Sequence, residues 1–119
     1  MKETRKRILI VEDEALNALF LQNILGKEFE VVAIVDNGPE AVLCAKEENP
    51  DCILMDIKIN GPMDGIETIH QILSEKRIDH IYCTAYSESS VTDRADATKP
   101  KGILPKPLDV LALKNLIRN

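Results

Sequence analysis

The chain has 119 residues, of which 45% are hydrophobic and 3% aromatic, so we expect one domain with a single core of aliphatic side chains. The formal net charge of −5 argues against nucleic-acid binding, and the one basic stretch, residues 2–7, is typical of a solvated amino terminus. No apolar stretch approaches the ~18 residues of a membrane span, and the amino terminus lacks the apolar segment of a signal peptide.

From residue 8 to residue 73, short apolar runs alternate with apolar residues at helical spacing. Three runs predict strands: Ile8–Val11, Val31–Val35 and Cys52–Met55. The first is continuously apolar, as is typical of a strand that is covered on both faces, and the second is rich in β-branched residues. Each is followed by a predicted helix, whose apolar residues are Leu16, Leu19, Phe20 and Ile24 in the first, Ala41, Val42 and Ala45 in the second, and Ile66, Ile69, Ile72 and Leu73 in the third.

Local signals mark the ends of these helices. Gly26 follows the first helix, and Pro39 stands in the first turn of the second, where its missing N–H is harmless. Pro50 ends the second helix. Asp64 and Glu67 have the spacing of a capping box, which predicts that the third helix begins after Asp64.

The last forty residues continue the alternation. His80–Cys83 and Ile103–Leu104 predict the fourth and fifth strands. Between them, Ser87–Lys99 is polar and predicts a short, weakly packed helix. Its only residues to bury are Val91, Ala95 and Ala97. The last helix is indicated by Val110, Leu113, Leu116 and Ile117.

Five strand–helix units predict an α/β fold that forms a single domain over residues 1–119. We expect a doubly wound, five-stranded parallel sheet in the order 2-1-3-4-5, with five helices of roughly 10–14 residues on both faces (flavodoxin-like). Pro105 fits a fifth strand at the edge of the sheet, where a missing ladder donor is tolerated.

Chemically active residues follow four of the five predicted strands. Glu12 and Asp13 follow the first, Asp56 the third, Thr84 the fourth, and Lys106 the fifth. Each has an ordinary structural explanation when it is taken alone, such as a helix cap or a surface lysine. The carboxyl ends of parallel strands meet at one edge, however, where open α/β sheets bind their ligands. We therefore expect these residues to form one site.

The three carboxylates predict a magnesium site. Side by side they would repel one another, and a hard divalent cation with carboxylate, carbonyl and water ligands removes this conflict. A carboxylate next to such a metal can attack a phosphoryl donor and form an acyl phosphate. Lys106 could then pair with the phosphoryl oxygens, and the Thr84 hydroxyl could donate a hydrogen bond to one of them.

These residues lie in stretches that together resemble the receiver (response-regulator) domain family of two-component signalling. The stretches are residues 8–15 (ILIVEDEA), 54–57 (LMDI), 63–67 (MDGIE), 84–87 (TAYS) and 104–107 (LPKP). The resemblance covers essentially the whole chain. It implies a module controlled by phosphorylation that catalyses its own aspartyl phosphorylation but turns over no substrate.

The resemblance also implies a role for each site residue. Asp56 would receive a phosphoryl group from a histidine kinase or a histidine phosphotransfer protein. Glu12, Asp13, Asp56 and the backbone carbonyl of Lys58 would hold Mg²⁺. Lys106 would pair with the phosphate, with its bond to Pro107 in the cis form found in the family.

Further positions would modulate this chemistry. Thr84 resembles the family's switch hydroxyl, but its usual aromatic companion is replaced by Ile103, so movement of the Thr84–Ser90 loop and the fourth helix becomes the expected output. Lys58 and Tyr86 occupy positions that influence hydrolysis of the acyl phosphate. Neither offers a carboxylate or amide to orient water, and we therefore predict slow self-dephosphorylation.

Three other functions have less support from the sequence. A haloacid-dehalogenase-type phosphatase would place its nucleophile in an Asp-x-Asp-x-Thr pattern after the first strand, whereas Asp13 is followed by Glu-Ala-Leu-Asn. A phosphorylation-silent interaction domain of the same fold would need no acceptor site. A nucleotide or flavin site is disfavoured, because no glycine-rich phosphate loop follows the first strand.

The expected partners are the phosphoryl donor and a downstream protein or fused domain, with no nucleic acid or membrane. Dimerisation through the fourth helix, fifth strand and fifth helix is a habit of the family. His70 and His80 are interpreted as a helix-surface residue and a strand residue rather than phosphoryl carriers. Cys44, Cys52 and Cys83 lack metal spacing and indicate reduced thiols in a cytoplasmic protein.

Overall fold

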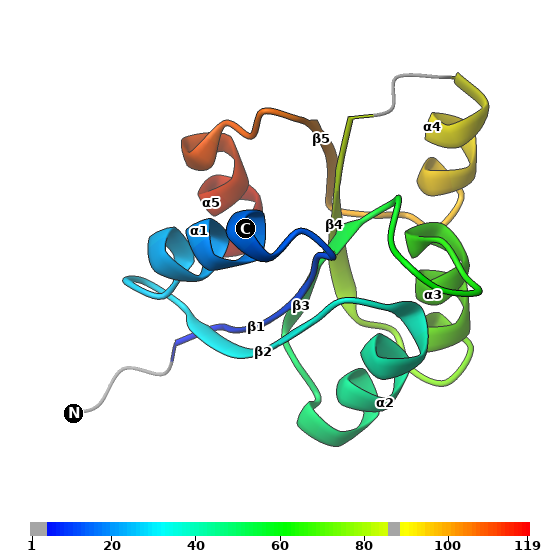
Figure 1. Ribbon diagram of the computed structural model, residues 1–119, viewed down its shortest axis with the longest axis horizontal. Coiled ribbons are helices and arrows are strands. Elements are labelled where there is room, and N and C mark those ends of the chain that lie inside the picture. Colours follow the sequence, from blue (N-terminus) through cyan, green and yellow to red (C-terminus); the bar gives the residue numbers. More distant parts are fainter. Residues whose placement is uncertain (1–4, 86–88) are drawn as a thin grey trace.

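The computed structural model describes residues 5–85 and 89–119, in which five strands alternate with five helices (Figure 1). The strands are β1 (Arg7–Val11), β2 (Glu30–Val35), β3 (Cys52–Asp56), β4 (Asp79–Thr84) and β5 (Gly102–Pro105). The helices are α1 (Ala15–Leu25), α2 (Gly38–Glu48), α3 (Gly65–Leu73), α4 (Ser89–Asp96) and α5 (Val110–Arg118). They have 8 to 11 residues, shorter than expected for all but α1 and α2.

The strands form one parallel sheet in the order β2-β1-β3-β4-β5, as predicted. Val11 is in register with Met55, so β1 and β3 end side by side at the middle of the sheet. Thr84 is in register with Pro105, which lies on the edge strand β5. The topology therefore brings the ends of four strands to one edge of the sheet.

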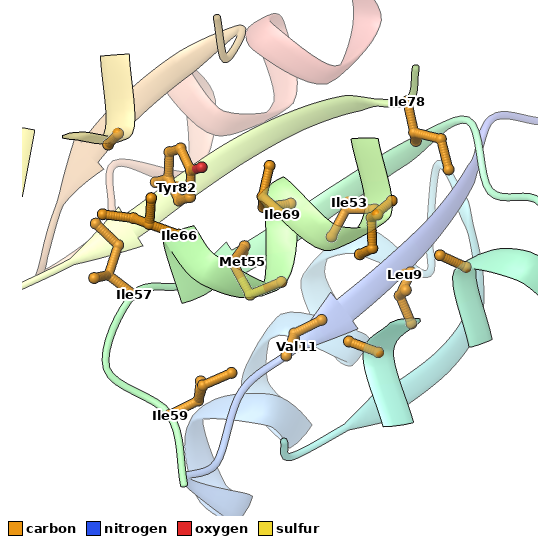
Figure 2. Close-up of a cluster of buried hydrophobic side chains, with 14 residues drawn as sticks. Leu9, Val11, Ile53, Met55, Ile57, Ile59, Ile66, Ile69, Ile78 and Tyr82 are labelled. Carbon is orange, nitrogen blue, oxygen red and sulfur yellow. The ribbon is translucent and has the colours of Figure 1, made fainter. Parts of the chain in front are cut away.

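Helices cover both faces of the sheet. Helices α1 and α5 lie over one face, and α2, α3 and α4 lie over the other (Figure 1). Successive strand residues point to opposite faces, so β1 and β3 each contribute to two cores. The core under α2–α4 contains Leu9, Val11, Ile53, Met55, Ile66, Ile69 and Tyr82 (Figure 2). The core under α1 and α5 contains Ile8, Ile10, Leu21, Leu25, Leu54, Leu113 and Ile117.

The predicted apolar face of α1 is wrong for three of its four residues, and only Ile24 packs against the core. Leu16 is 83% exposed, and Leu19 and Phe20 are also exposed. The side chains that α1 buries are those of Ala18, Leu21 and Leu25. Because this helix carries apolar residues around most of its circumference, spacing alone did not identify the buried side.

Helix α4 is short, as predicted, but one of its expected core residues is not buried. Ala95 is buried and Val91 is partly buried, whereas Ala97 is exposed. Thr98, just beyond the helix, is buried with 3% exposure. A polar residue that the sequence pattern did not predict is therefore part of the interior here.

Thr98 belongs to a buried hydrogen-bond chain on β4. Its hydroxyl lies 2.8 Å from the Tyr82 hydroxyl and 2.9 Å from Nε2 of His80, and Nδ1 of His80 lies 3.1 Å from the carbonyl oxygen of Ile78. The Thr98 hydroxyl also donates to the carbonyl oxygen of Ala95 at 2.7 Å, so its oxygen lies among three polar partners in the core. The chain attaches the segment after α4 to the middle of β4.

Polar contacts set the ends of several elements. Asp64 caps α3 in the predicted capping box, with the backbone N–H of Glu67 donating to Asp64 at 2.8 Å and that of Asp64 donating to Glu67 at 3.0 Å. Within the described part of the basic stretch, Lys6 is less solvated than expected, because its ammonium donates to the carbonyl oxygen of Ile117 at 2.7 Å. Within residues 5–85 and 89–119, no helix has the length and apolar character needed to cross a membrane.

Candidate functional site

Three carboxylates meet where β1 and β3 end. Glu12 directly follows β1, and Asp56 is the last residue of β3. Each of Glu12, Asp13 and Asp56 offers an oxygen, and these oxygens lie within 4.8 Å of one another. Glu12 and Asp56 are buried, and Asp13 is half-buried. The cluster predicted from the sequence is therefore present.

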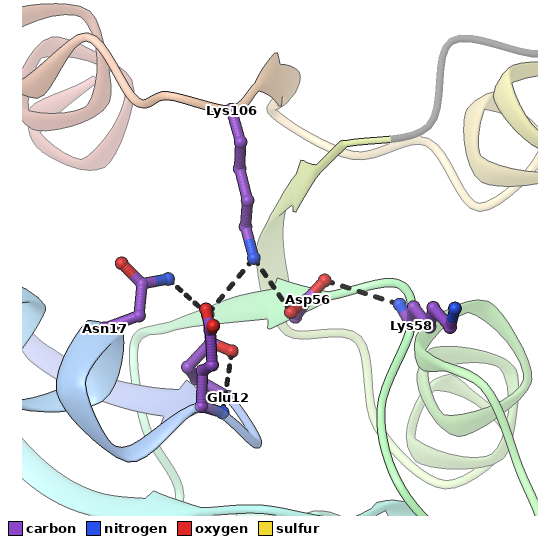
Figure 3. Close-up of polar contacts among 6 residues, drawn as sticks. Glu12, Asn17, Asp56, Lys58 and Lys106 are labelled. Carbon is purple, nitrogen blue, oxygen red and sulfur yellow. Dashed lines mark hydrogen bonds and ion pairs between the residues drawn. The ribbon is translucent and has the colours of Figure 1, made fainter.

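Lys106 reaches this cluster from the loop after β5. Its Nζ lies 2.9 Å from Oδ2 of Asp56 and 3.3 Å from Oε1 of Glu12 (Figure 3). The ammonium stands between the two carboxylates and partly offsets their charge. The peptide bond between Lys106 and Pro107 is cis, as the family resemblance implied.

Glu12 is held by two further donors. The backbone N–H of Glu14 donates to Oε2 at 3.1 Å, and the side-chain amide of Asn17 donates to Oε1 at 2.6 Å (Figure 3). Asn17 belongs to none of the motifs that predicted the site. Its position five residues after Glu12, on the first turn of α1, is the only signal in the sequence that could have pointed to it.

Burial and neighbouring charges move the pKa values of these groups in opposite directions. Burial, with a contribution from the charge of Glu12, raises the pKa of Asp56 to about 6, although Lys106 opposes the change. Burial also acts to raise the pKa of Glu12, but the hydrogen bonds from Glu14 and Asn17 and the charge of Lys106 leave it below its ordinary value. For Lys106, burial acts to lower the pKa, and pairing with Asp56 and Glu12 reverses this and raises it.

A cavity of about 360 Å³ opens beside Asp56. It is lined by Asp56, Lys58, Thr84, Ala85 and Lys106. Thr84 is buried at the end of β4, and the backbone N–H of Lys58 donates to Oδ1 of Asp56 at 3.3 Å. A carboxylate, a hydroxyl and an ammonium therefore line one opening.

Gly65 allows α3 to pack directly against the end of β3. Its backbone N–H donates to the carbonyl oxygen of Ile57 at 2.6 Å. A Cβ at this position would collide with the backbone carbonyl of Asp56 and with Ile57. The glycine thus lets the start of α3 support the segment that carries Asp56.

The other predicted site residues have different outcomes. Ile103, at the position that the resemblance gives to an aromatic residue, is partly buried and packs against the core under α2–α4. Tyr86 lies outside the described residues.

His80 is fully buried in the strand and His70 is exposed on α3, in line with their structural interpretation. Cys44, Cys52 and Cys83 are free thiols, and burial raises the pKa of Cys52 to about 12.

Comparison with known proteins gives a consistent picture. A family model described as "Response regulator receiver domain" matches residues 8–118. The chemotaxis protein CheY of Bacillus subtilis is 41% identical over 105 residues, which are 85% of each chain. Sporulation initiation phosphotransferase F of the same organism is 32% identical over 117 residues, covering 95% of this chain and 91% of the relative.

Another relative is longer than this chain. The transcriptional regulatory protein PdtaR of Mycobacterium tuberculosis is 34% identical over 106 residues, and the chain spans about half (51%) of its length. Among solved structures, the signal receiver domain of a modulated diguanylate cyclase from Desulfovibrio desulfuricans G20 superposes with a TM-score of 0.89 at 34% identity. That superposition covers 96% of this chain and 91% of the other.

Proposed function

Because the chain belongs to the response regulator receiver domains of two-component signalling, we propose that it accepts a phosphoryl group on Asp56. The donor would be the phosphohistidine of a histidine kinase or of a histidine phosphotransfer protein. The observation that carries the proposal is the meeting of Asp56 with Glu12, Asp13 and Lys106 at the edge of the sheet. A relative named as a phosphotransferase that matches 95% of the chain adds support.

The acidic cluster fits Mg²⁺. Its protein donors are carboxylate oxygens, the ligand type that this ion prefers, and they lie close enough together to share one ion. Glu12, Asp13, Asp56 and the backbone carbonyl of Lys58 would hold it. When bound, Mg²⁺ would offset the charge of the carboxylates and polarise the oxygens of the incoming phosphoryl group.

The other residues would act on the phosphoryl group directly. An oxygen of Asp56 would form a bond to phosphorus while the bond from phosphorus to the donor nitrogen breaks. Lys106 would turn from Asp56 to a phosphoryl oxygen, forming a charge-assisted hydrogen bond. Thr84, which lines the same cavity, would donate its hydroxyl proton to a second oxygen. We propose that the chain turns over no substrate beyond this self-catalysed step.

Phosphoryl uptake from a small donor tests the proposal. Incubation with acetyl phosphate and Mg²⁺ should give one acid-stable, base-labile phosphate on Asp56, identified by mass spectrometry. Asp56→Asn should abolish it, whereas Asp79→Asn, which changes an exposed aspartate at the far end of β4, should not. Uptake that is absent from the wild type, or that persists in Asp56→Asn, would overturn the proposal. The first result would favour a phosphorylation-silent interaction domain.

The output would pass through the β4–α4 region. Ile103 replaces the aromatic residue of the usual switch, so a ring rotation cannot carry the signal. The carboxyl end of α4 is anchored by Thr98, whose carbonyl oxygen also accepts a hydrogen bond from Arg77 at 3.0 Å. Movement of Thr84 toward a phosphoryl group would therefore displace the loop that precedes α4 and the amino-terminal part of this helix.

We further propose a single receiver domain over residues 1–119 that works in the cytoplasm and signals to a downstream protein or fused domain. The three free thiols fit a reducing compartment. Pairing of two copies through α4, β5 and α5 would place the proposed output region at the interface. Neither nucleic acid nor membrane is expected to bind the chain itself, given its net charge of −5.

A further inference from the structure

The contact between Asn17 and Glu12 is the part of the site that the proposed reaction does not use. The Asn17 side chain is half-buried on α1 and points its amide nitrogen at Oε1 of Glu12 (Figure 3). At 2.6 Å, it is closer to this oxygen than Lys106, which lies at 3.3 Å. An asparagine within a helix often forms hydrogen bonds with the nearby backbone, but here the side-chain amide donates to a buried carboxylate.

Glu12 needs such a partner because of its length. A glutamate has one more rotatable bond than an aspartate, and fixing that bond costs conformational entropy. The Glu14 N–H fixes Oε2, so a donor on Oε1 determines the remaining orientation of the carboxylate. Lys106 supplies one donor to Oε1, but Lys106 also pairs with Asp56 and would turn to the phosphoryl group in the proposed reaction. The Asn17 amide takes no part in that exchange.

We propose that Asn17 is a positioning residue for the metal site, holding the Glu12 carboxylate in the orientation that binds Mg²⁺ whether or not Lys106 is engaged elsewhere. This inference rests on the proposed function of Glu12 as a metal ligand. It adds a residue from α1 to the site and explains why a polar side chain occupies a half-buried position on an otherwise apolar helix surface.

Titration with Mg²⁺ alone, followed by amide NMR shifts, tests the proposal without any phosphoryl donor. Asn17→Leu keeps the approximate size of the side chain but removes the donor, and we expect it to weaken Mg²⁺ binding about tenfold, the usual effect of losing a group that orients a metal ligand. Asn23→Leu makes the same substitution at an exposed position of α1 and should leave Mg²⁺ affinity unchanged. Asn17→Gln, which keeps an amide donor, should recover part of the loss.

A double-mutant cycle separates positioning from general damage to α1. Glu12→Asp withdraws the carboxylate from the reach of Asn17, so Asn17→Leu in the Glu12→Asp background should change Mg²⁺ affinity little. An equal loss in both backgrounds would overturn the inference. Asn17→Ala is a second variant without the amide donor, and it is included in case Asn17→Leu fails to fold. Wild-type Mg²⁺ affinity in both variants would also overturn the inference.

The failure of this inference is distinguishable from failure of the proposed function. If wild-type protein binds no Mg²⁺, the metal site itself is refuted, and the inference falls with it. If wild-type protein binds Mg²⁺ and Asn17→Leu binds it equally well, only the role of Asn17 is refuted.

Discussion

The Lys106 ammonium lies 2.9 Å from Oδ2 of Asp56, although the two residues are 50 positions apart in the sequence. Asp56 is the last residue of β3, whereas Lys106 follows β5. This ion pair has two opposite consequences for the site. It stabilises the charged form of a buried carboxylate, and it places a positive charge where a metal ion would bind. The balance between these effects can be measured by removing the charge.

Replacing Lys106 with methionine should strengthen Mg²⁺ binding while impairing phosphoryl uptake. The ammonium occupies oxygens of Asp56 and Glu12 and repels the cation, and about 1 kcal/mol of screened repulsion corresponds to roughly fivefold in affinity. The same variant should take up phosphate from acetyl phosphate more slowly, since a partner for the phosphoryl oxygens is lost. Lys27→Met, on an exposed loop, is the control. Unchanged Mg²⁺ affinity in Lys106→Met would argue against competition between the two cations.

Lys58→Asn should speed loss of the phosphoryl group from Asp56. The Lys58 side chain is exposed beside the cavity and offers no group that would orient a water for attack, whereas an asparagine amide would. We expect the decay rate to rise roughly threefold or more. Decay of phosphorylated protein after removal of the donor measures this, with Lys27→Asn as the matched control. A decay rate equal to that of the wild type would refute the proposed influence of this position.

The buried His80 should make stability depend on pH. Burial lowers the pKa of His80 in the folded state, so the unfolded chain takes up a proton first as the pH falls. Stability from this residue is therefore complete above about pH 6.5 and is lost as the pH falls below it, by at most about 1.4 kcal/mol per pH unit. Relative to His80→Gln, the wild type should lose free energy of unfolding between pH 7 and pH 5.

Urea unfolding at several pH values measures this difference. His70→Gln is the control, because it removes an exposed imidazole on α3. Parallel pH profiles for wild type and His80→Gln would contradict the prediction.

Thr98→Val should destabilise the fold by about 1–3 kcal/mol, the cost of leaving buried polar groups without partners. Its hydroxyl connects the Tyr82 hydroxyl, at 2.8 Å, with the His80 ring, at 2.9 Å. Tyr82→Phe removes one of the groups that Thr98→Val would strand, so the double variant should lose less than the sum of the two single losses. Strict additivity in urea unfolding would show that the three residues do not act as a chain.

Much of the fold could be predicted because each strand and its helix carry local signals. The run of residues Cys52–Asp56 is buried throughout, and the capping-box spacing of Asp64 and Glu67 predicts the start of α3. Since parallel strands must end at a common edge, the order of the strands was enough to bring Asp13, Asp56 and Lys106 into one predicted site.

What could not be predicted depends on orientation rather than on order. Helix α1 reads ALNALFLQNIL, and many rotations of such a helix would bury large apolar side chains, so only packing against the sheet shows that Leu16 stays outside. The bond from Asn17 to Glu12 likewise depends on how α1 is rotated. The Tyr82–Thr98–His80 chain joins two elements across the core and leaves no local pattern in the sequence.

The site draws its acidic groups from strands inside the sheet and its ammonium group from beyond the edge strand. β1 and β3 are each flanked by two strands, whereas Lys106 follows β5, which has a neighbour on one side only. Amide hydrogens near Glu12 and Asp56 should consequently exchange with solvent among the slowest, and those around Lys106 much sooner. On gradual heating, the carboxylates of Glu12 and Asp56 should thus keep their mutual geometry after the Lys106 ammonium has already separated from them.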